Sequence, residues 1–429
     1  MRLTLTVRGD EIVADFAGSN PQVPGVVNST LATTGAGVVV AVKAALDPDG
    51  PINAGTFRPI HLRAPEASIV DVRLDAPAGA HGEVRKRAVS VMLGALAQVV
   101  PDLVSGDLCG TSFPNAIGGR DARRRRDYVY YEAPAGGNGA WLGEDGASAW
   151  GNIDFGNIRT IQSAEALESA MPLRVERSER RCDSGGEGRT RGGLGLRREI
   201  RLLDGEARYS VLSDRAVLPP FGVRGAGPAA SVRVSIRRDA EETELATPGK
   251  VTGHAISAGD TVIMESAGGG GYGDPLTREP ERVRQDVLAG YVSTARARLG
   301  YGVVLAPDGE VDDRATLAER ARLAAARRRF PVVHDERDPY EGRRGKHRVL
   351  RLASRLAHAL RLETGDLVEM LGRHAAPLRA WVRVEDVAPE GQVALDALGR
   401  RILGVSPGDG VEIRRLETSP TPAASARRQ

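Results

Sequence analysis

Hydrophobic and polar residues alternate at the start of the chain and again across much of its middle. Residues 3–16 alternate on both sides of the polar turn at 8–11, which predicts a hairpin with one buried face. Similar segments predict strands at 58–72, 127–133, 173–179, 197–203, 208–213 and 261–265. The Asp-Gly pair at 204–205 is a strong hairpin signal, so we expect the two strands beside it to pair. Strands therefore dominate up to about Glu265.

Helical spacing appears in four other places. Residues 30–46 and 83–100 combine small apolar residues with a terminating turn or proline, and each predicts a buried or amphipathic helix. Residues 277–305 predict two short helices, with Thr277 as an N-cap and acidic residues in the first turn. A further helix is expected at 319–329, a segment rich in Arg and Ala.

The last quarter of the chain contains an internal repeat. Residues 360–370 align with 403–413 at an offset of 43, and each copy has an apolar residue, a Gly-Asp turn and a strand. The polar stretch 334–346 before this repeat is typical of a linker. The pattern predicts a small duplicated β-barrel and resembles the double-psi barrels at the amino ends of AAA ATPases, which usually bind partners or peptides. An ordinary Pro-Gly-Asp turn before a strand is the alternative interpretation.

Composition argues against several classes of partner. The 429 residues include 59 Lys or Arg against 56 Asp or Glu, so the net charge of +3 gives no basic stripe for nucleic acid. Only 4% of residues are aromatic, which disfavours a stacking platform for single strands. No apolar run approaches the ~18 residues that a membrane span requires. We therefore expect a cytoplasmic protein without nucleic-acid or membrane partners.

Three glycine-rich segments are the candidates for chemistry. Residues 268–275 could turn backbone N–H groups toward a phosphate, but they lack the lysine and helix of a phosphate loop, which favours a tight turn with close backbone contact. Residues 183–195 place Asp183, Arg189 and Arg191 in a glycine-rich loop that could hold an anion. The plainer interpretation is a long glycine turn between two strands, capped by Asp183. Residues 136–141 allow the same two interpretations.

Metal and nucleophile motifs are missing from the sequence. The two cysteines, Cys109 and Cys182, are far apart, and the seven histidines form none of the common metal spacings. The four-arginine run 123–126 favours an exposed hairpin tip over a nucleic-acid patch. We therefore expect no metal site and no cofactor site in this chain.

Several ordered motifs together resemble the second half of the hydantoinase B family, which includes N-methylhydantoinase B, the carboxyl portion of 5-oxoprolinases and the large subunits of acetone and acetophenone carboxylases. The resemblance covers residues 1 to about 305. Its motifs are DFAGSNPQVPGVVNS (15–29), LDPDGPINAGTFRPI (46–60), LGALAQVVP (93–101), GGNGAW (136–141), PLRVERSERRCDSGGEGRTRGGLG (172–195), LSDR (212–215) and ESAGGGGYGDPLTREPERV (265–283).

The resemblance implies an α+β fold: a β-rich hydantoinase B-type half-domain with a few packed helices, followed by the small duplicated barrel. The implied divisions are residues 1–305 for the half-domain, 306–346 for a helical and polar linker, 347–416 for the double-psi-barrel-like domain and 417–429 for a disordered tail. Substrate- or partner-facing candidates within the matching motifs are Asn138, Trp141, Asp183, Arg189, Arg191 and Asp214.

The same resemblance implies a role in a complex. A hydantoinase A-type partner carries the ATP site and phosphorylates an oxygen of a small cyclic amide or ketone, and the B-type subunit completes hydrolysis or carboxylation near a divalent metal. The family's metal motif lies upstream of the region that begins here at Asp15, so ATP and metal are expected in partner chains, one of which carries the B-type amino-terminal half. The alternative is a non-catalytic scaffold or binding protein derived from a truncated hydantoinase B. The sequence does not choose a substrate, or between hydrolase and carboxylase.

Overall fold

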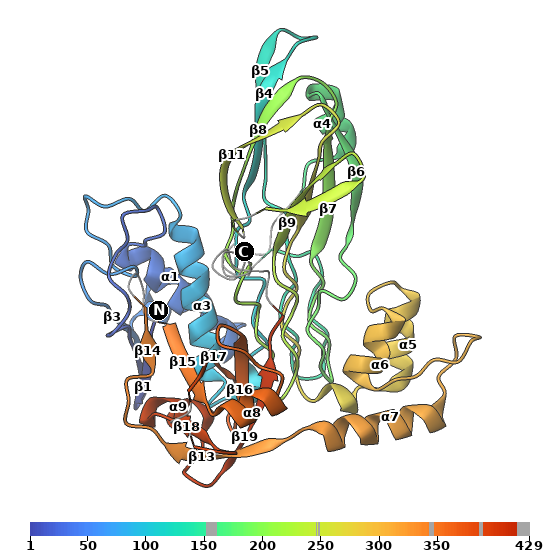
Figure 1. Ribbon diagram of the computed structural model, residues 1–429. Coiled ribbons are helices and arrows are strands. Elements are labelled where there is room, and N and C mark those ends of the chain that lie inside the picture. The colour runs from blue at the N-terminus through green and yellow to red at the C-terminus, as the bar shows by residue number, and fades with distance from the viewer. Residues whose placement is uncertain (152–160, 246, 248, 343–346, 386–388, 418–429) are drawn as a thin grey trace.

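The structure, a computed structural model, describes residues 1–151, 161–245, 247, 249–342, 347–385 and 389–417. Figure 1 shows two tall sheets standing above the middle of the molecule, with the N-terminal part at one side and the C-terminal sheet at the base. The predicted tail at 417–429 lies, except for Glu417, outside the described residues.

The N-terminal part is a three-stranded sheet covered by two helices. Strands β1 (Thr4–Arg8) and β2 (Glu11–Asp15) form the predicted hairpin, and β3 (Ile60–Arg63) pairs parallel with β2. Helices α1 (Leu31–Leu46) and α3 (His81–Leu96) share one hydrophobic core with this sheet. Both helices were predicted, and the short α2 (Ala54–Phe57) and η1 (Pro101–Leu103) complete this part.

The predicted strand at 58–72 is wrong beyond Arg63. Pro65 lacks an N–H donor, and Ala67 has a φ of 54°, so the chain turns out of the sheet. Ser68 instead makes isolated bridges to Pro21 and Asp71.

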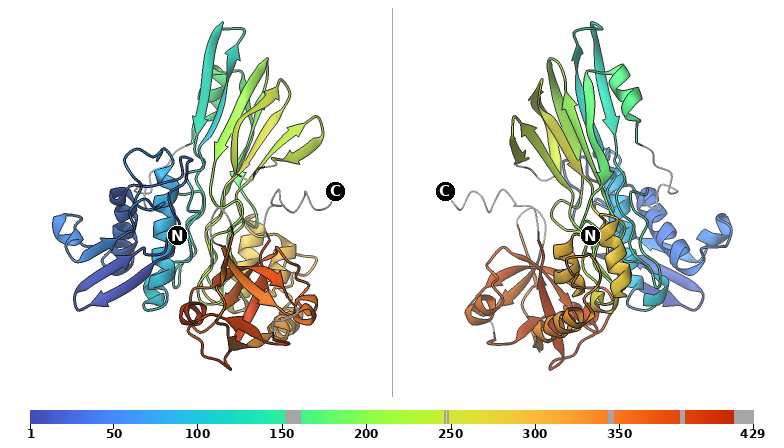
Figure 2. Two further views of the ribbon diagram at one scale, coloured as in Figure 1. Left: turned by 60° about the vertical axis from the view of Figure 1, so that its left-hand side comes forward. Right: turned by 90° about the vertical axis from the view of Figure 1, so that its right-hand side faces the viewer.

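Two antiparallel sheets pack face to face above the centre and share a second core (Figure 2). One sheet has the order β11-β8-β4-β5 and the other the order β10-β9-β12-β7-β6. The core between them includes Tyr130 and Tyr209 from the first sheet and Ile200 and Val262 from the second. The strands are β4 (Asn115–Asp121), β5 (Arg126–Glu132), β6 (Leu173–Arg180), β7 (Leu196–Leu202), β8 (Glu206–Leu212), β9 (Arg233–Arg238), β10 (Glu241–Glu244), β11 (Lys250–Ser257) and β12 (Thr261–Glu265), with α4 (Ala164–Ala170) beside β6.

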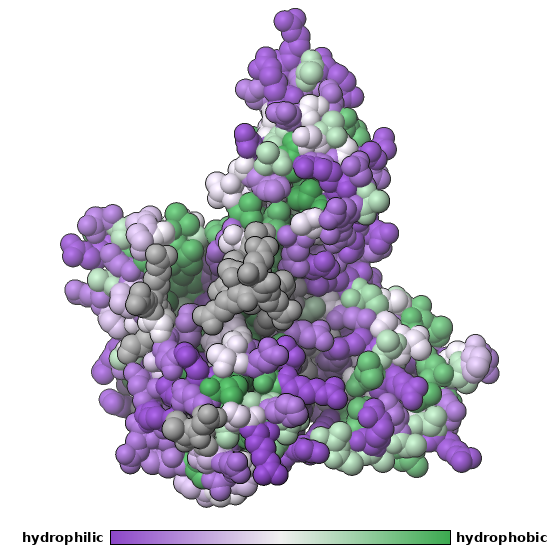
Figure 3. Space-filling model, viewed as in Figure 1, coloured by the Kyte–Doolittle hydropathy of each residue, from purple (hydrophilic) through white to green (hydrophobic). Residues whose placement is uncertain are grey.

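The hairpin expected at Asp204-Gly205 does not form. Strand β7 pairs with β6 and β12, whereas β8 pairs with β4 and β11, so the turn carries the chain from one sheet to the other. Gly205 has a φ of 71°, and a tight turn with this geometry serves a sheet-to-sheet crossing as well as a hairpin. The exposed tip at 122–125, between β4 and β5, is the hairpin predicted from the arginine run, and its surroundings are hydrophilic (Figure 3).

Below the two sheets lies a glycine core, defined as residues 105–109, 136–149, 184–195, 221–227 and 266–273. These extended segments form backbone hydrogen bonds with each other. The N–H of Gly193 donates to the backbone carbonyl of Asn138 at 2.8 Å. The N–H groups of Gly269 and Gly186 donate to the carbonyls of Gly193 and Gly269, both at 2.9 Å. A Cβ added to Gly270 would lie 1.8 Å from the carbonyl oxygen of Phe221, and one on Gly192 would lie 1.8 Å from that of Gly269. The close backbone contact expected for residues 268–275 is therefore confirmed.

A group of helices follows the glycine core. They are η3 (Pro275–Thr277), α5 (Pro280–Leu288), α6 (Thr294–Tyr301) and α7 (Asp313–Ala326). The two predicted short helices are present, although α5 begins after Glu279 and Thr277 belongs to η3. Helix α7 starts six residues before the predicted 319 and ends before Arg329. Over the ranges that the structure describes, no helix combines the length and apolar character needed to cross a bilayer.

The C-terminal part is a seven-stranded sheet with the order β14-β15-β17-β16-β19-β13-β18. Its strands are β13 (Arg329–His334), β14 (Tyr340–Glu341), β15 (His347–Leu352), β16 (Leu367–Leu371), β17 (Leu378–Val384), β18 (Val393–Leu395) and β19 (Gly410–Arg415), with helices α8 (Ser354–Ala359) and α9 (Ala397–Leu403). One core of buried aliphatic residues lies within it. A closed barrel is not evident from the strand order.

The repeat seen in the sequence is visible in this part as β15-α8-β16 and β18-α9-β19. The carboxylates of Asp366 and Asp409 each accept a hydrogen bond from the backbone N–H of the residue three positions earlier, at 2.9 and 2.8 Å. Gly365 and Gly408 both have left-handed φ values, 100° and 91°. The two copies thus share their turn geometry as well as their residues.

The linker prediction for 306–346 is wrong at its C-terminal end. Strand β13 pairs antiparallel with β19 and parallel with β18, and β14 pairs with β15. Positions 343–346 lie outside the described residues. The sheet therefore begins near Arg329. Residues of β13 that the sequence assigned to a linker pair with strands from later in the chain.

We predict that Gly270→Ala lowers the free energy of unfolding by about 3 kcal/mol, because the methyl group overlaps a backbone carbonyl that cannot move without breaking other segments. Urea unfolding followed by circular dichroism measures this. Gly25→Ala is the control, since Gly25 has open space and no left-handed φ. Equal stability of the two variants would contradict the close-packing account.

We predict that residues 329–417 fold when expressed alone, whereas 347–417 do not, because the shorter fragment loses β13 and exposes the edges of β18 and β19. Proton NMR dispersion of the two fragments is the measurement. A folded 347–417 would restore the domain boundary drawn from the sequence.

Candidate functional site

Arg191 lies at the centre of the contacts that tie the glycine core to the following helices. Its side chain is buried, its Nε lies 3.3 Å from Asp286 Oδ1 of α5, and its Nη1 donates to the Gly192 carbonyl at 2.7 Å. The guanidinium also lies over the Tyr291 ring, 5.2 Å from its centroid. These contacts turn Arg191 inward and give it a structural role.

A second arginine, Arg278, completes this network. Only 1% of its side chain is exposed, and it bonds both oxygens of Asp145 at 2.7 Å and Asp286 Oδ2 at 2.8 Å. Burial raises the pKa of Asp145, but the bonds from Arg278 outweigh this and hold the pKa below its usual value. Sequence analysis missed Arg278, because 133 residues separate it from Asp145 and no local motif joins the two.

The other two residues of the predicted anion-binding loop do not converge on Arg191. Asp183 has a φ of 59° and accepts a hydrogen bond from the Ser293 N–H, 2.7 Å away, at the start of α6. Arg189 is exposed, and only its backbone bonds to the glycine core, through Gly273. The loop joins the antiparallel strands β6 and β7, which confirms the plainer interpretation of its backbone.

Asn138 and Trp141 lie on an adjoining segment of the glycine core. The Asn138 side chain is half-buried, and its Oδ1 atom has no hydrogen-bond partner among the described residues. Trp141 is half-buried, and its carbonyl accepts from the Thr190 hydroxyl at 2.6 Å. Leu142 and Trp150 nearby in the chain are about half exposed, at 52% and 48%. This segment thus combines a buried, unsatisfied acceptor with exposed apolar side chains nearby in the chain.

Asp214 lies in a separate polar cluster between α3 and the end of β8. Its carboxylate is 3.2 Å from Lys250 Nζ and 3.6 Å from Arg87 Nε. Burial raises the pKa of Asp214, but these cations together reverse the shift and lower it. The backbone N–H of Asp214 donates to Thr111, whose hydroxyl donates to the buried Glu83 at 2.7 Å.

The neighbouring Arg215 is fully enclosed in the same cluster. It pairs with the buried Asp107 and donates to the Ser90 hydroxyl at 2.8 Å. Burial lowers the pKa of Arg215 to about 10. The LSDR motif therefore anchors the glycine core to α3 through Arg215 and leaves Asp214 partly accessible.

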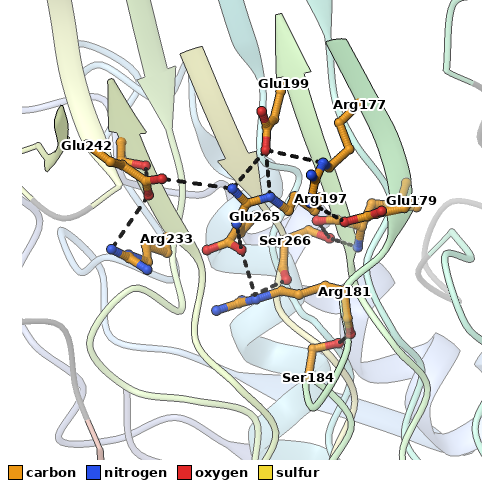
Figure 4. A network of polar contacts seen from close by, with 12 residues as sticks. Arg177, Glu179, Arg181, Ser184, Arg197, Glu199, Arg233, Glu242, Glu265 and Ser266 are labelled. Atoms are coloured by element: carbon orange, nitrogen blue, oxygen red, sulfur yellow. Dashed lines mark hydrogen bonds and ion pairs between the residues drawn. The ribbon is translucent and has the colours of Figure 1, made fainter. Parts of the chain in front are cut away.

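A third polar network joins the glycine core to the five-stranded sheet (Figure 4). Arg197 bonds Glu199 and Glu265 at 2.7 and 2.8 Å, and Arg181 donates to the carbonyls of Ser231 and Ser266. Burial lowers the pKa of Arg181. Every arginine and glutamate drawn in this view has an opposite charge or a polar acceptor nearby, which is the condition for burying charges.

A resident metal does not fit the side chains of this part of the chain. Among the described residues, His, Cys, Asp and Glu form no group of three or more that could hold a metal ion. Cys109 is buried and Cys182 is exposed.

A family model described as hydantoinase B/oxoprolinase matches residues 1–275. The chain belongs to this family. The match ends at η3, so α5 to α7 and the C-terminal sheet lie outside it.

Individual relatives agree with this assignment. The caprolactamase subunit beta of Pseudomonas jessenii is 31% identical over 328 residues, which are 73% of this chain and 55% of that protein. The crystal structure of the ATP-dependent caprolactamase from Pseudomonas jessenii superposes with a TM-score of 0.67 and 30% identity, over 74% of this chain and 56% of that one. An acetone carboxylase structure has a TM-score of 0.64 at 23% identity, over 75% and 48% of the two chains, and shows the shared fold alone. The chain spans about half the length of curated relatives that it matches.

We predict that Arg191→Ala lowers the free energy of unfolding by about 3 kcal/mol, because it removes one member of a buried charge network. Arg189→Ala, two residues away and exposed, changes it by less than about 0.5 kcal/mol. Urea titration of both variants measures the difference. A similar small effect for both would show that Arg191 is dispensable for the fold.

Proposed function

We propose that this chain is a subunit of an ATP-dependent hydantoinase- or 5-oxoprolinase-type amidohydrolase, or of a ketone carboxylase, and contributes part of a B-type active site. Membership of the hydantoinase B/oxoprolinase family carries the proposal. One relative of known structure is named as an ATP-dependent caprolactamase, which favours a cyclic amide as the substrate class. The proposed partner that supplies ATP is a hydantoinase A-type subunit.

A second proposed partner is a chain with the B-type amino-terminal half. Supporting this, the N-terminal part of the chain exposes large apolar side chains. Ile52 is 72% exposed, Leu74 fully exposed and Val99 70% exposed. A hollow of about 480 Å³ also opens between α1 and strands β2 and β3, with Val42, Leu46 and Ile60 in its wall. Exposed apolar surface of this kind is typical of a subunit interface.

We place the substrate- or partner-facing surface at Asn138, Trp141 and Arg189. The buried Oδ1 of Asn138 has no hydrogen-bond partner within the described part of the chain, which costs about 1–3 kcal/mol, and a ligand amide would supply one once the side chain turns outward. Trp141 adds apolar area beside it, and the Arg189 guanidinium is exposed. We assign Asp183 and Arg191 to positioning this loop, and Asp214 to the partly exposed cluster with Lys250 and Arg87.

We propose that the divalent metal and ATP bind in the partner chains. The described side chains do not fit a metal, since they form no group of three ligands. No step of a mechanism is therefore assigned to a metal in this chain. Its own contribution is a rigid backbone surface and the Asn138 acceptor.

We further propose that the C-terminal part is a double-psi-barrel-like module. Supporting this, the two repeat copies pair with each other when β13 is counted with the first copy and β17 with the second. Strand β13 then pairs with β18 and β19 of the second copy, and β17 pairs with β15 and β16 of the first. Strands β16 and β19 pair at the centre of the sheet. The parallel pairs β13–β18 and β15–β17 occupy equivalent places.

Co-expression with candidate A-type and B-type amino-terminal chains tests the complex. We expect the three chains to co-purify and to hydrolyse ATP when hydantoin, 5-oxoproline, caprolactam or acetophenone is added, and the isolated chain to be inactive. The double variant Ile52→Glu with Leu74→Glu should abolish co-purification. Leu317→Glu is the control, because Leu317 is equally exposed, at 73%, but lies on α7.

Two results would contradict this function. Turnover by the isolated chain would show that the partners are unnecessary. Equal substrate-dependent ATP hydrolysis by the other two chains alone would show that this chain is a scaffold.

A further inference from the structure

A pocket of about 580 Å³ lies where the glycine core, helices α6 and α7, and the C-terminal sheet meet. Its volume lies within the range of small-molecule sites. Most of its wall comes from residues after 275, beyond the stretch matched by the family model. The pocket is thus separate from the surface at Asn138, Trp141 and Arg189, and its ligand is independent of the proposed function.

The charged lining of this pocket is strongly cationic. It contains five arginines against two glutamates, Glu187 and Glu412. Arg296 pairs with Glu187, and Arg414 pairs with Glu412 at 2.7 Å. A third arginine, Arg327, is held by both oxygens of Asp274 at 2.6 and 2.7 Å.

The remaining two arginines, Arg328 and Arg361, make no side-chain hydrogen bond or ion pair among the described residues. Arg328 follows α7, and Arg361 follows α8, so they approach the pocket from different elements. Both are exposed. Two uncompensated guanidinium groups in one pocket repel each other and favour an anion between them.

The backbone at Arg361 gives an independent reason to assign a role to its side chain. Its φ is 55°, in the left-handed region where glycine is preferred after a helix. The equivalent position in the second repeat copy is Gly404, with a φ of 66° and with His374 close by. Arg361 thus occupies a position where glycine would be favoured, and such strain often accompanies ligand contact.

Apolar side chains form the rest of the wall. They include Leu276 of η3 and Leu299 of α6, together with Phe330 of β13 and Ile413 of β19. Glu187 is buried, and burial raises its pKa against the pull of Arg296. The pocket therefore combines cations with apolar surface, which suits a ligand that has an anionic group and an organic body.

We propose that this pocket binds a small organic phosphate ester, with the phosphate between Arg328 and Arg361 and the organic group against Leu299 and Phe330. A phosphate dianion balances two guanidinium groups and accepts their paired N–H donors. The bound ester contacts both the helices and the C-terminal sheet, so it holds these two parts together. The site is distinct from the ATP site proposed for the A-type partner.

Isothermal titration of the full chain at low ionic strength with phenyl phosphate, inorganic phosphate and phenylacetate tests the proposal. We expect phenyl phosphate to bind best, because it satisfies both the cations and the apolar wall. Arg328→Gln and Arg361→Gly should each weaken its binding by about tenfold or more. The control Arg314→Gln, an exposed arginine of α7 outside the pocket, should leave binding unchanged.

Arg361→Gly also has an effect that separates ligand binding from folding. We expect the ligand-free Tm to rise by about 2 °C, because glycine relieves the left-handed strain. Weaker binding by a more stable protein cannot result from misfolding. Absence of phenyl phosphate binding at about 10 mM, equal binding of phenylacetate, or unchanged affinity in both pocket variants would each overturn the proposal.

Discussion

Close contact between glycine backbones is the constraint on which the rest of this structure depends. Five segments from residues 105 to 273 come within hydrogen-bonding distance of one another without any side chain between them. Many of their N–H groups donate to carbonyl oxygens of other segments, so these backbone groups are satisfied without an ordinary sheet. Because a Cβ at Gly137 or Gly192 would lie within 2 Å of a carbonyl oxygen, these positions admit no other residue.

The glycines at the centre of this packing have no side chains, whereas Val223 and Tyr272 of the same segments pack into the neighbouring hydrophobic core. Charged side chains hold the edges of the glycine contacts. Arg191 and Arg278 tie one edge to α5, Arg215 ties another to α3, and Arg181 with Arg197 ties a third to the five-stranded sheet. Each is an arginine, whose planar group can bond several carbonyl or carboxylate oxygens at once. At these edges, arginine side chains therefore anchor the glycine core to the elements around it.

The sequence predicted local structure well where one face is buried or a turn repeats. The first hairpin, α1, α3, the glycine contacts at 268–273 and the repeat at 360 and 403 follow from periodicity and turn residues. It failed where the choice depends on distant partners. The turn at Gly205 fits a hairpin or a sheet crossing equally, and β13 becomes a strand only because β19 lies beside it. For the candidate site, Asn138 and Trp141 were found from their glycine neighbours, but the inward turn of Arg191 depends on Asp286, 95 residues away.

The glycine core and the side chains around it differ in how much substitution they allow. The backbone contacts leave no freedom for substitution at glycines such as Gly192, whereas the side chains of Trp141 and Arg189 are half-buried and exposed and can change without disturbing the packing. Function then depends on grafted sites and not on the fold itself. The C-terminal sheet shows the same contrast between a fixed backbone and a changed side chain. Its two repeat copies have the same turns at Asp366 and Asp409, but the residue after the helix is Arg361 in one copy and Gly404 in the other. The two copies share the left-handed backbone at these positions, so they differ there only in the side chain.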